Sequence, residues 1–181
     1  MPWFDRTAVL KLSAFAIRKS IQDGFYSKPG ELASSPADNK GFDQNEPFAI
    51  YFMLWGYAFE TLLKGGYIRI KGTLEKEATD KGHDLIGLAK LLELEVRPGD
   101  VKILELLTKY IVWAGRYPIP LDHTNYSEEG LPIHNYTEWQ QGGDRAFERS
   151  IRMLYGRFQK AILNRQDWLD IKLGVNRPPV V

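Results

Sequence analysis

The chain has 181 residues, which is long enough for one domain with a single hydrophobic core and short for two. Hydrophobic residues make up 44% of the sequence and aromatic residues 13%, which excludes a disordered chain. Lys and Arg number 24 against 23 Asp and Glu, so the chain lacks the basic excess of proteins that bind nucleic acid by phosphate neutralisation, and any such contact is expected to be local and modest.

Two helices are predicted in the first half of the chain. The first covers about residues 5–23, where apolar residues recur at helical spacing. The second opens at residues 46–47, with a proline at its first helical position, and continues to residue 70. Because it is apolar nearly all round its first three turns, it is predicted to lie at the centre of a bundle. The charged and polar residues 71–82 are predicted to form a solvated connection.

Three more helices are predicted in the second half. The third covers about residues 83–95 and carries its leucines on one stripe. The fourth is expected to be capped by Asp100 and to stop before Pro118, because a proline cannot continue a helix. The fifth covers about residues 144–167 and has a regular apolar seam that faces a core.

The segments between these helices contain no predicted sheet. Residues 27–45 and 115–143 are rich in polar residues, Pro and Gly, and are predicted to be long loops. Runs of alternating polar and apolar residues are too short to build a sheet. The sequence therefore predicts an all-α fold, a single-domain antiparallel helical bundle of about five helices that covers residues 1–181.

The cellular location is predicted from what the sequence lacks. There is no cysteine, which excludes disulfides, thiolate metal sites and cysteine nucleophiles and fits a reducing compartment. The first residues do not resemble a secretory signal. The most apolar run, residues 48–59, is shorter than the roughly 20 residues that cross a bilayer. We therefore expect a soluble, cytoplasmic protein with no membrane segment.

Standard catalytic motifs are also missing. The sequence contains no phosphate-binding loop, dinucleotide-binding turn, zinc-protease helix or serine-hydrolase elbow. The histidines, His83, His123 and His134, do not have the spacing of a metal site on one helix. No metal and no cofactor are therefore predicted.

Arg116 and His123 are the first candidate site residues. They lie seven positions apart where the fourth predicted helix gives way to the aromatic loop. A histidine can move protons near neutral pH, and a guanidinium can stabilise the charge that develops on phosphate oxygens, so together they suit metal-free phosphodiester cleavage. The alternative is that Arg116 caps the end of the helix and His123 is an ordinary loop residue.

Glu60 and Lys64 are the second candidate pair. A glutamate four residues before a lysine is the favourable orientation on a helix, and the apolar setting predicts that the pair is half buried. It is either a structural ion pair or the rim of a pocket or dimer interface. His83, at the start of the third predicted helix, is expected to cap or pack that helix or to act near its N-terminus. Aromatic residues around the long loop, such as Tyr117, either stack on bases or hold the loop on the helices.

Three segments resemble the HEPN superfamily, a group of helical bundles named for nucleotide binding in higher eukaryotes and prokaryotes. They are residues 55–64, the helix start Gly82-His83-Asp84-Leu85 followed by Leu88, and residues 113–118. The resemblance covers about residues 46–165 and leaves the first helix as an extra packing element.

The resemblance implies a function and a partner. Many HEPN proteins are metal-independent endoribonucleases of toxin–antitoxin, phage-defence and RNA-processing systems. Their signature is an arginine followed after four to six residues by a histidine, and two signatures meet across a homodimer. Arg116 and His123 fit this spacing. By this resemblance, Arg116 would hold the scissile phosphate and His123 would handle a proton, leaving a cyclic phosphate.

Tyr117, Pro118 and Pro120 depart from the HEPN pattern. The family usually has a polar residue directly after the arginine, and the two prolines interrupt the helix within the motif. Besides a purely structural bundle without a ligand, two hypotheses therefore stand side by side. One is a ribonuclease that uses Arg116 and His123. The other is a non-catalytic binding or dimerisation module that takes a nucleotide or a partner protein, such as an antitoxin, at Glu60, Lys64 and Tyr117.

Overall fold

The computed structural model describes residues 2–22, 46–114 and 144–165. Within these ranges the chain forms α-helices and one π-helical segment, with no β-strand, which confirms the predicted all-α class. The elements are α1 (Pro2–Gln22), α2 (Glu46–Lys71), α3 (Lys76–Asp80), α4 (Leu85–Leu91), α5 (Pro98–Lys109), η2 (Tyr110–Ala114) and α7 (Asp144–Asn164).

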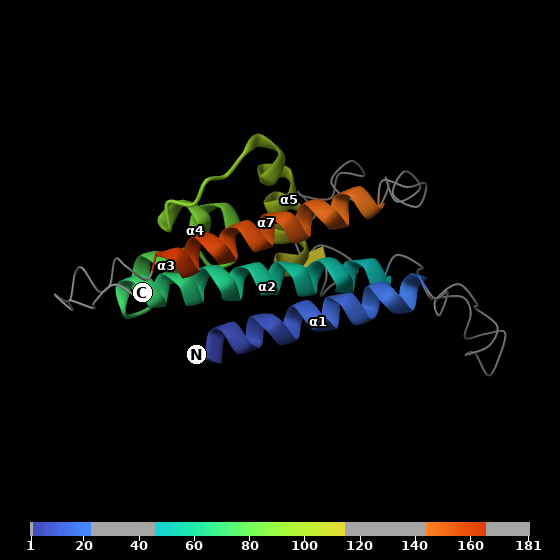
Figure 1. The fold of residues 1–181 in the computed structure, drawn as a ribbon, viewed down its shortest axis with the longest axis horizontal. Helices are drawn as coiled ribbons and strands as arrows, with labels where there is room; N and C mark the ends of the chain where they lie inside the picture. The colour runs from blue at the N-terminus through green and yellow to red at the C-terminus, as the bar shows by residue number, and fades with distance from the viewer. Residues whose placement is uncertain (1, 23–45, 115–143, 166–181) are drawn as a thin grey trace, which may run out of the picture.

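Helix α2 lies at the centre of the bundle, as its apolar sequence predicts. No residue from Tyr51 to Ile70 is exposed. The helices α1, α4, α5 and α7 and the segment η2 all pack against it, and Figure 1 shows α2 between α1 and α7. The buried apolar side chains of all these elements join in one hydrophobic core.

Trp55 shows how α2 holds its neighbours together. Its ring is fully buried and meets Phe15 of α1 edge-on, with ring centroids 5.5 Å apart. On another side it meets Tyr155 of α7 at 5.7 Å. Such edge-to-face contacts add roughly 0.5–1.5 kcal/mol each to the stabilisation that comes from burial alone. One side chain of α2 thus contacts two helices from opposite ends of the chain.

The helices do not all run in alternate directions. The colour gradient shows that α1 and α2 are antiparallel, as predicted, whereas α7 runs in the same direction as α2 (Figure 1). Helix α1 packs along α2, which agrees with its expected role as an added packing element. The described bundle is therefore of mixed direction around α2.

Glycines allow the neighbouring helices to approach α2 closely. A Cβ atom at Gly56 would lie 2.4 Å from Cγ2 of Ile111 and 2.9 Å from the carbonyl oxygen of Leu107. Gly65 and Gly66 make similarly close approaches to Trp3 of α1 and Ile162 of α7. These glycines, which weaken a helix in isolation, here remove the side chains that would keep the helices apart.

The region between α2 and α5 differs from the prediction. Residues 71–82 contain the short helix α3, in which Ala78 is buried. Helix α4 covers only residues 85–91 of the predicted 83–95. Asp84 sets its start because its side chain accepts a hydrogen bond from the backbone N–H of Gly87 at 2.9 Å. Glu93, with a φ of 51°, lies in the left-handed region just beyond its end.

Asp100 is not the N-cap of α5, and this part of the prediction is wrong. Pro98, which has no N–H, takes the first helical position, and Arg97 precedes it as the N-cap. Asp100 acts from the third position, where its carboxylate accepts the backbone N–H of Arg97 at 2.7 Å. The same carboxylate pairs with Arg157 of α7, so this cap also ties α5 to α7.

The described helices do not meet the requirements for crossing a bilayer. None of them combines the length and the apolar character that a bilayer-spanning helix needs.

We expect Gly56→Ala to destabilise the protein although alanine favours a helix. The added methyl group meets the side chain of Ile111 and the backbone of Leu107, and such overpacking costs roughly 1–3 kcal/mol. Chemical denaturation measures the loss.

Gly156 of α7 provides the matched control, because nothing lies within 4 Å of a Cβ at that position. Gly156→Ala should raise the free energy of unfolding by about 0.5–1 kcal/mol, as expected for an unobstructed helical glycine. Equal effects of the two substitutions would contradict the close approach at Gly56.

Candidate functional site

Glu60, Lys64 and His83 form a contact cluster, here called the Glu60 cluster. Lys64 Nζ lies 2.7 Å from Oε1 of Glu60, and His83 Nδ1 lies 2.8 Å from Oε2. Glu60 and Lys64 come from adjacent turns of α2, whereas His83 lies 23 residues further along, in the turn before α4. Both oxygens of one carboxylate are therefore engaged by basic side chains.

Local structure fixes His83 in this position. Gly82 adopts a φ of 54°, which favours glycine, and brings the chain into a tight turn. The hydroxyl of Thr108 on α5 donates to the carbonyl oxygen of His83 at 3.4 Å and accepts from the N–H of Leu85 at the same distance. The turn before α4 is therefore attached to α5 through its backbone and to α2 through the His83 ring.

The three side chains differ in their access to solvent. The exposed fractions are 12% for Glu60, 15% for Lys64 and 38% for His83, so the carboxylate and ammonium groups are mostly buried and the imidazole is the open member. Burial of a charge is expensive unless the charge is paired, and Glu60 and Lys64 satisfy each other.

The contact with Glu60 favours one tautomer of the His83 ring. An ionised carboxylate only accepts hydrogen bonds, so the contact requires the tautomer in which Nδ1 donates to Glu60. In the neutral ring, Nε2 is then left as an acceptor. A carboxylate that orients an imidazole in this way is a common arrangement for proton transfer. The Tyr57 ring lies edge-on beside His83, with centroids 6.4 Å apart.

The π-helical segment η2 leads from α5 toward Arg116. It packs on α2, where Ile111 lies against Gly56, one turn before Glu60. Burial raises the pKa of Tyr110, the first residue of η2, to about 12, so its phenol stays neutral at physiological pH. π-helical turns often occur near functional sites, and this one directly precedes a segment singled out by the sequence.

The predicted site residues fall into two groups. Arg116, Tyr117 and His123 lie outside the described residues, so their relation to the Glu60 cluster stays a prediction. Glu60 and Lys64 form the expected ion pair in a largely buried setting. Their role in ligand binding also stays a prediction.

His83 is the site residue whose partner sequence reasoning missed. It was expected to cap or pack the helix, but Asp84 is the cap and His83 contacts Glu60. The only available signal was that His83 comes directly before Asp84, a residue type that favours the N-cap. This places His83 in the turn before the helix, where the sequence does not predict which way its side chain points.

Metal ligands and known relatives add no further information about the site. Among the described residues, no group of three or more His, Asp or Glu side chains is arranged to hold a metal ion. No protein-family model, curated protein or solved structure matches this chain.

We expect Glu60 and Lys64 to be energetically coupled. Glu60→Gln leaves the mostly buried ammonium group of Lys64 without its carboxylate, which should lower the free energy of unfolding by roughly 1–3 kcal/mol. Combining it with Lys64→Met, which keeps the apolar stem, should cost less than the sum of the single changes, with a coupling of about 0.5–3 kcal/mol by urea denaturation.

The pair Glu95–Arg97 is the control for this double-mutant cycle. Its side chains are 69% and 58% exposed, and water screens the interaction. The same cycle there should show no measurable coupling. A coupling at Glu60 no larger than that of the surface pair would mean that burial adds nothing to the contact.

Proposed function

We propose that the chain is a HEPN-like bundle that acts on or binds RNA or nucleotides in the region around the Glu60 cluster. One observation carries this proposal, the 2.8 Å contact between His83 and Glu60. It joins two of the three segments on which the HEPN resemblance rests, residues 55–64 and residues 82–85. The third, residues 113–118, begins at the end of η2, which packs against the same helix α2.

The catalytic version is a metal-independent endoribonuclease. His123 removes the proton of a ribose 2′-hydroxyl, the 2′-oxygen attacks the adjacent phosphorus, and the 5′-oxygen leaves with a proton. Arg116 stabilises the charge on the phosphate oxygens. The products are a 2′,3′-cyclic phosphate and a free 5′-hydroxyl. Because this reaction needs both a base and an acid, the carboxylate-oriented His83 is a second residue to test.

The rival version is a non-catalytic module for a nucleotide or for a partner protein such as an antitoxin. It is favoured by the internal pairing of the Glu60 cluster, in which one carboxylate serves both Lys64 and His83. Side chains that pair with one another in this way can also serve only to stabilise the fold. The two versions differ in whether RNA is cut, which one assay decides.

We expect purified protein to cleave RNA in the presence of EDTA and to leave cyclic phosphate ends. Arg116→Ala and His123→Ala should each reduce the rate by about 100-fold or more, the usual effect of losing a general base or a transition-state donor. His83→Ala is measured beside them, with Arg97→Ala, an exposed surface change, as the control.

Two outcomes of the cleavage assay contradict the catalytic version. No cleavage by the wild type leaves the binding module, and RNA or nucleotide binding is then measured directly. Equal cleavage by all variants indicates a contaminating nuclease.

The proposed homodimer has a candidate surface on α1. Asp5, Val9, Leu12, Ala16 and Lys19 follow one another at steps of three and four residues and are all exposed, so they form one stripe. Val9 and Leu12 are 61% and 64% exposed, which is unusual for two neighbouring apolar residues on one face. A second copy, packed antiparallel about Leu12, would place Asp5 opposite Lys19 at both ends.

We expect Leu12→Glu to convert a dimer into a monomer, because it places two like charges together at the symmetry axis. Asp5→Lys should weaken the dimer, and the swap Asp5→Lys/Lys19→Asp should restore it. Light scattering at micromolar concentration measures the mass. Met153→Glu, at a residue 68% exposed on α7, is the control. A wild type that is monomeric in this range would contradict the dimer.

A further inference from the structure

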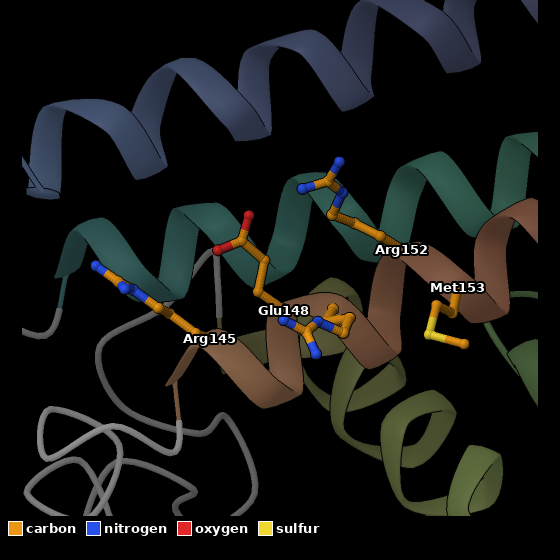
Figure 2. Close-up of a pocket in the computed structure, with 5 residues that line it drawn as sticks. Arg145, Glu148, Arg152 and Met153 are labelled. Carbon is orange, nitrogen blue, oxygen red and sulfur yellow. The ribbon is translucent and has the colours of Figure 1, made fainter.

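We infer that the exposed face of α7 binds the phosphate backbone of single-stranded RNA; this inference rests on the proposed RNA-directed function. Arg145, Glu148, Arg149, Arg152 and Met153 line a shallow groove of about 610 Å³ there (Figure 2). They recur at steps of three, one, three and one residues and therefore share one side of the helix. Arg145, Arg149 and Arg152 are here called the arginine face.

The positive charge of the arginine face is not neutralised. None of its three arginines forms an ion pair with another residue in the described ranges. The carboxylate in the groove, Glu148, is already paired with Arg18 of α1, with Nε and Oε2 3.3 Å apart and both side chains mostly buried. The groove thus presents three guanidinium groups beside one carboxylate that already has a partner on α1.

One member of the arginine face, Arg152, is also held in place. The guanidinium of Arg152 lies over the Phe15 ring of α1, 5.3 Å from its centroid. Figure 2 shows Glu148 and Arg152 extending toward α1, while Met153 lies further along α7. Met153 is 68% exposed and offers apolar surface beside the arginines. A flexible strand could place phosphates on the guanidinium groups and a base against the thioether.

Charge is unevenly distributed over the fold. Helices α1 and α7 hold nine basic and three acidic residues, whereas the other described residues, 46–114 and 165, hold ten of each. Within the described residues, the positive excess therefore lies on α1 and α7. A polyanion is attracted to such an excess of positive charge, which fits a local contact at these helices.

Spacing and residue type favour a phosphate backbone. At a rise of about 1.5 Å per residue, the three arginines are spread over roughly 10 Å of α7, room for two or three successive phosphates of a flexible strand. All three are arginines, whose planar fork binds phosphate oxygens in pairs. An acidic protein segment is the rival occupant.

The test is RNA binding measured by fluorescence anisotropy as a function of salt. The probe is a labelled 2′-O-methyl oligouridylate of about 12 nucleotides, a length within the range of single-strand binding sites. Because its 2′-oxygens are methylated, they cannot attack the phosphorus, and the probe is not cut. Arg145→Gln/Arg149→Gln should weaken binding by about tenfold and lower the slope of log affinity against log salt by about 1.4, since each phosphate contact contributes about 0.7.

Lys102→Gln/Lys109→Gln is the matched control. Both lysines are exposed on α5, and the change removes the same charge. Binding by this control should stay within about twofold of the wild type, since it removes no phosphate contact. Equal losses in both double variants would mean that only net charge matters and would overturn the arginine face.

Other outcomes separate this inference from the proposed function. If the wild type binds RNA and Arg145→Gln/Arg149→Gln binds it equally, the arginine face is overturned while the RNA-directed function stands. If the wild type neither binds nor cleaves RNA, both fail. If a labelled polyglutamate binds the wild type as tightly as the RNA does, the face is assigned to an acidic protein instead.

Discussion

The burial of α2 on all sides is the constraint on which the rest of the structure depends. A helix with no exposed residue from Tyr51 to Ile70 needs covering elements around its whole circumference. Helix α1 covers one side, α7 another, and α4, α5 and η2 the remainder. Neighbouring elements can approach α2 closely where it carries a glycine, as at Gly56. The shape of the bundle therefore follows from the need to remove one apolar helix from water.

The same constraint explains why a polar cluster exists where it does. Glu60 and Lys64 lie on this enclosed helix, and neither charge reaches bulk water freely. An isolated carboxylate there would be strongly destabilising, so its two oxygens need donors. Lys64 supplies one from its own helix, and His83 supplies the other from the turn before α4. The His83 side chain stays 38% exposed, so it is the member of the cluster that is most open to solvent.

The sequence predicted the elements whose pattern is local and missed those that depend on contacts between distant residues. The central place of α2 followed from its composition, and α7 followed from its regular apolar seam. Helix α3 was missed because five residues are too few to show a period. The contact of Glu60 with His83 spans 23 residues and that of Arg18 with Glu148 spans 130, and no local pattern encodes either. Arg116 and His123 lie outside the described residues, so they stay predictions from spacing and resemblance alone.

Net charge illustrates a limit of reasoning from composition. A net charge near zero correctly excludes a chain that is basic throughout. It is an average over the whole chain, however, and a ligand contacts only one part of the surface. In this fold α1 and α7, which carry an excess of basic residues, are linked by the contacts Arg18–Glu148 and Arg152–Phe15. The Glu60 cluster lies where α2 meets the turn before α4, whereas the arginine face lies on α7. Both α4 and α7 pack against α2. A strand held along α7 would therefore be positioned relative to α2 itself, and α2 also carries Glu60 and contacts the segment that leads to Arg116.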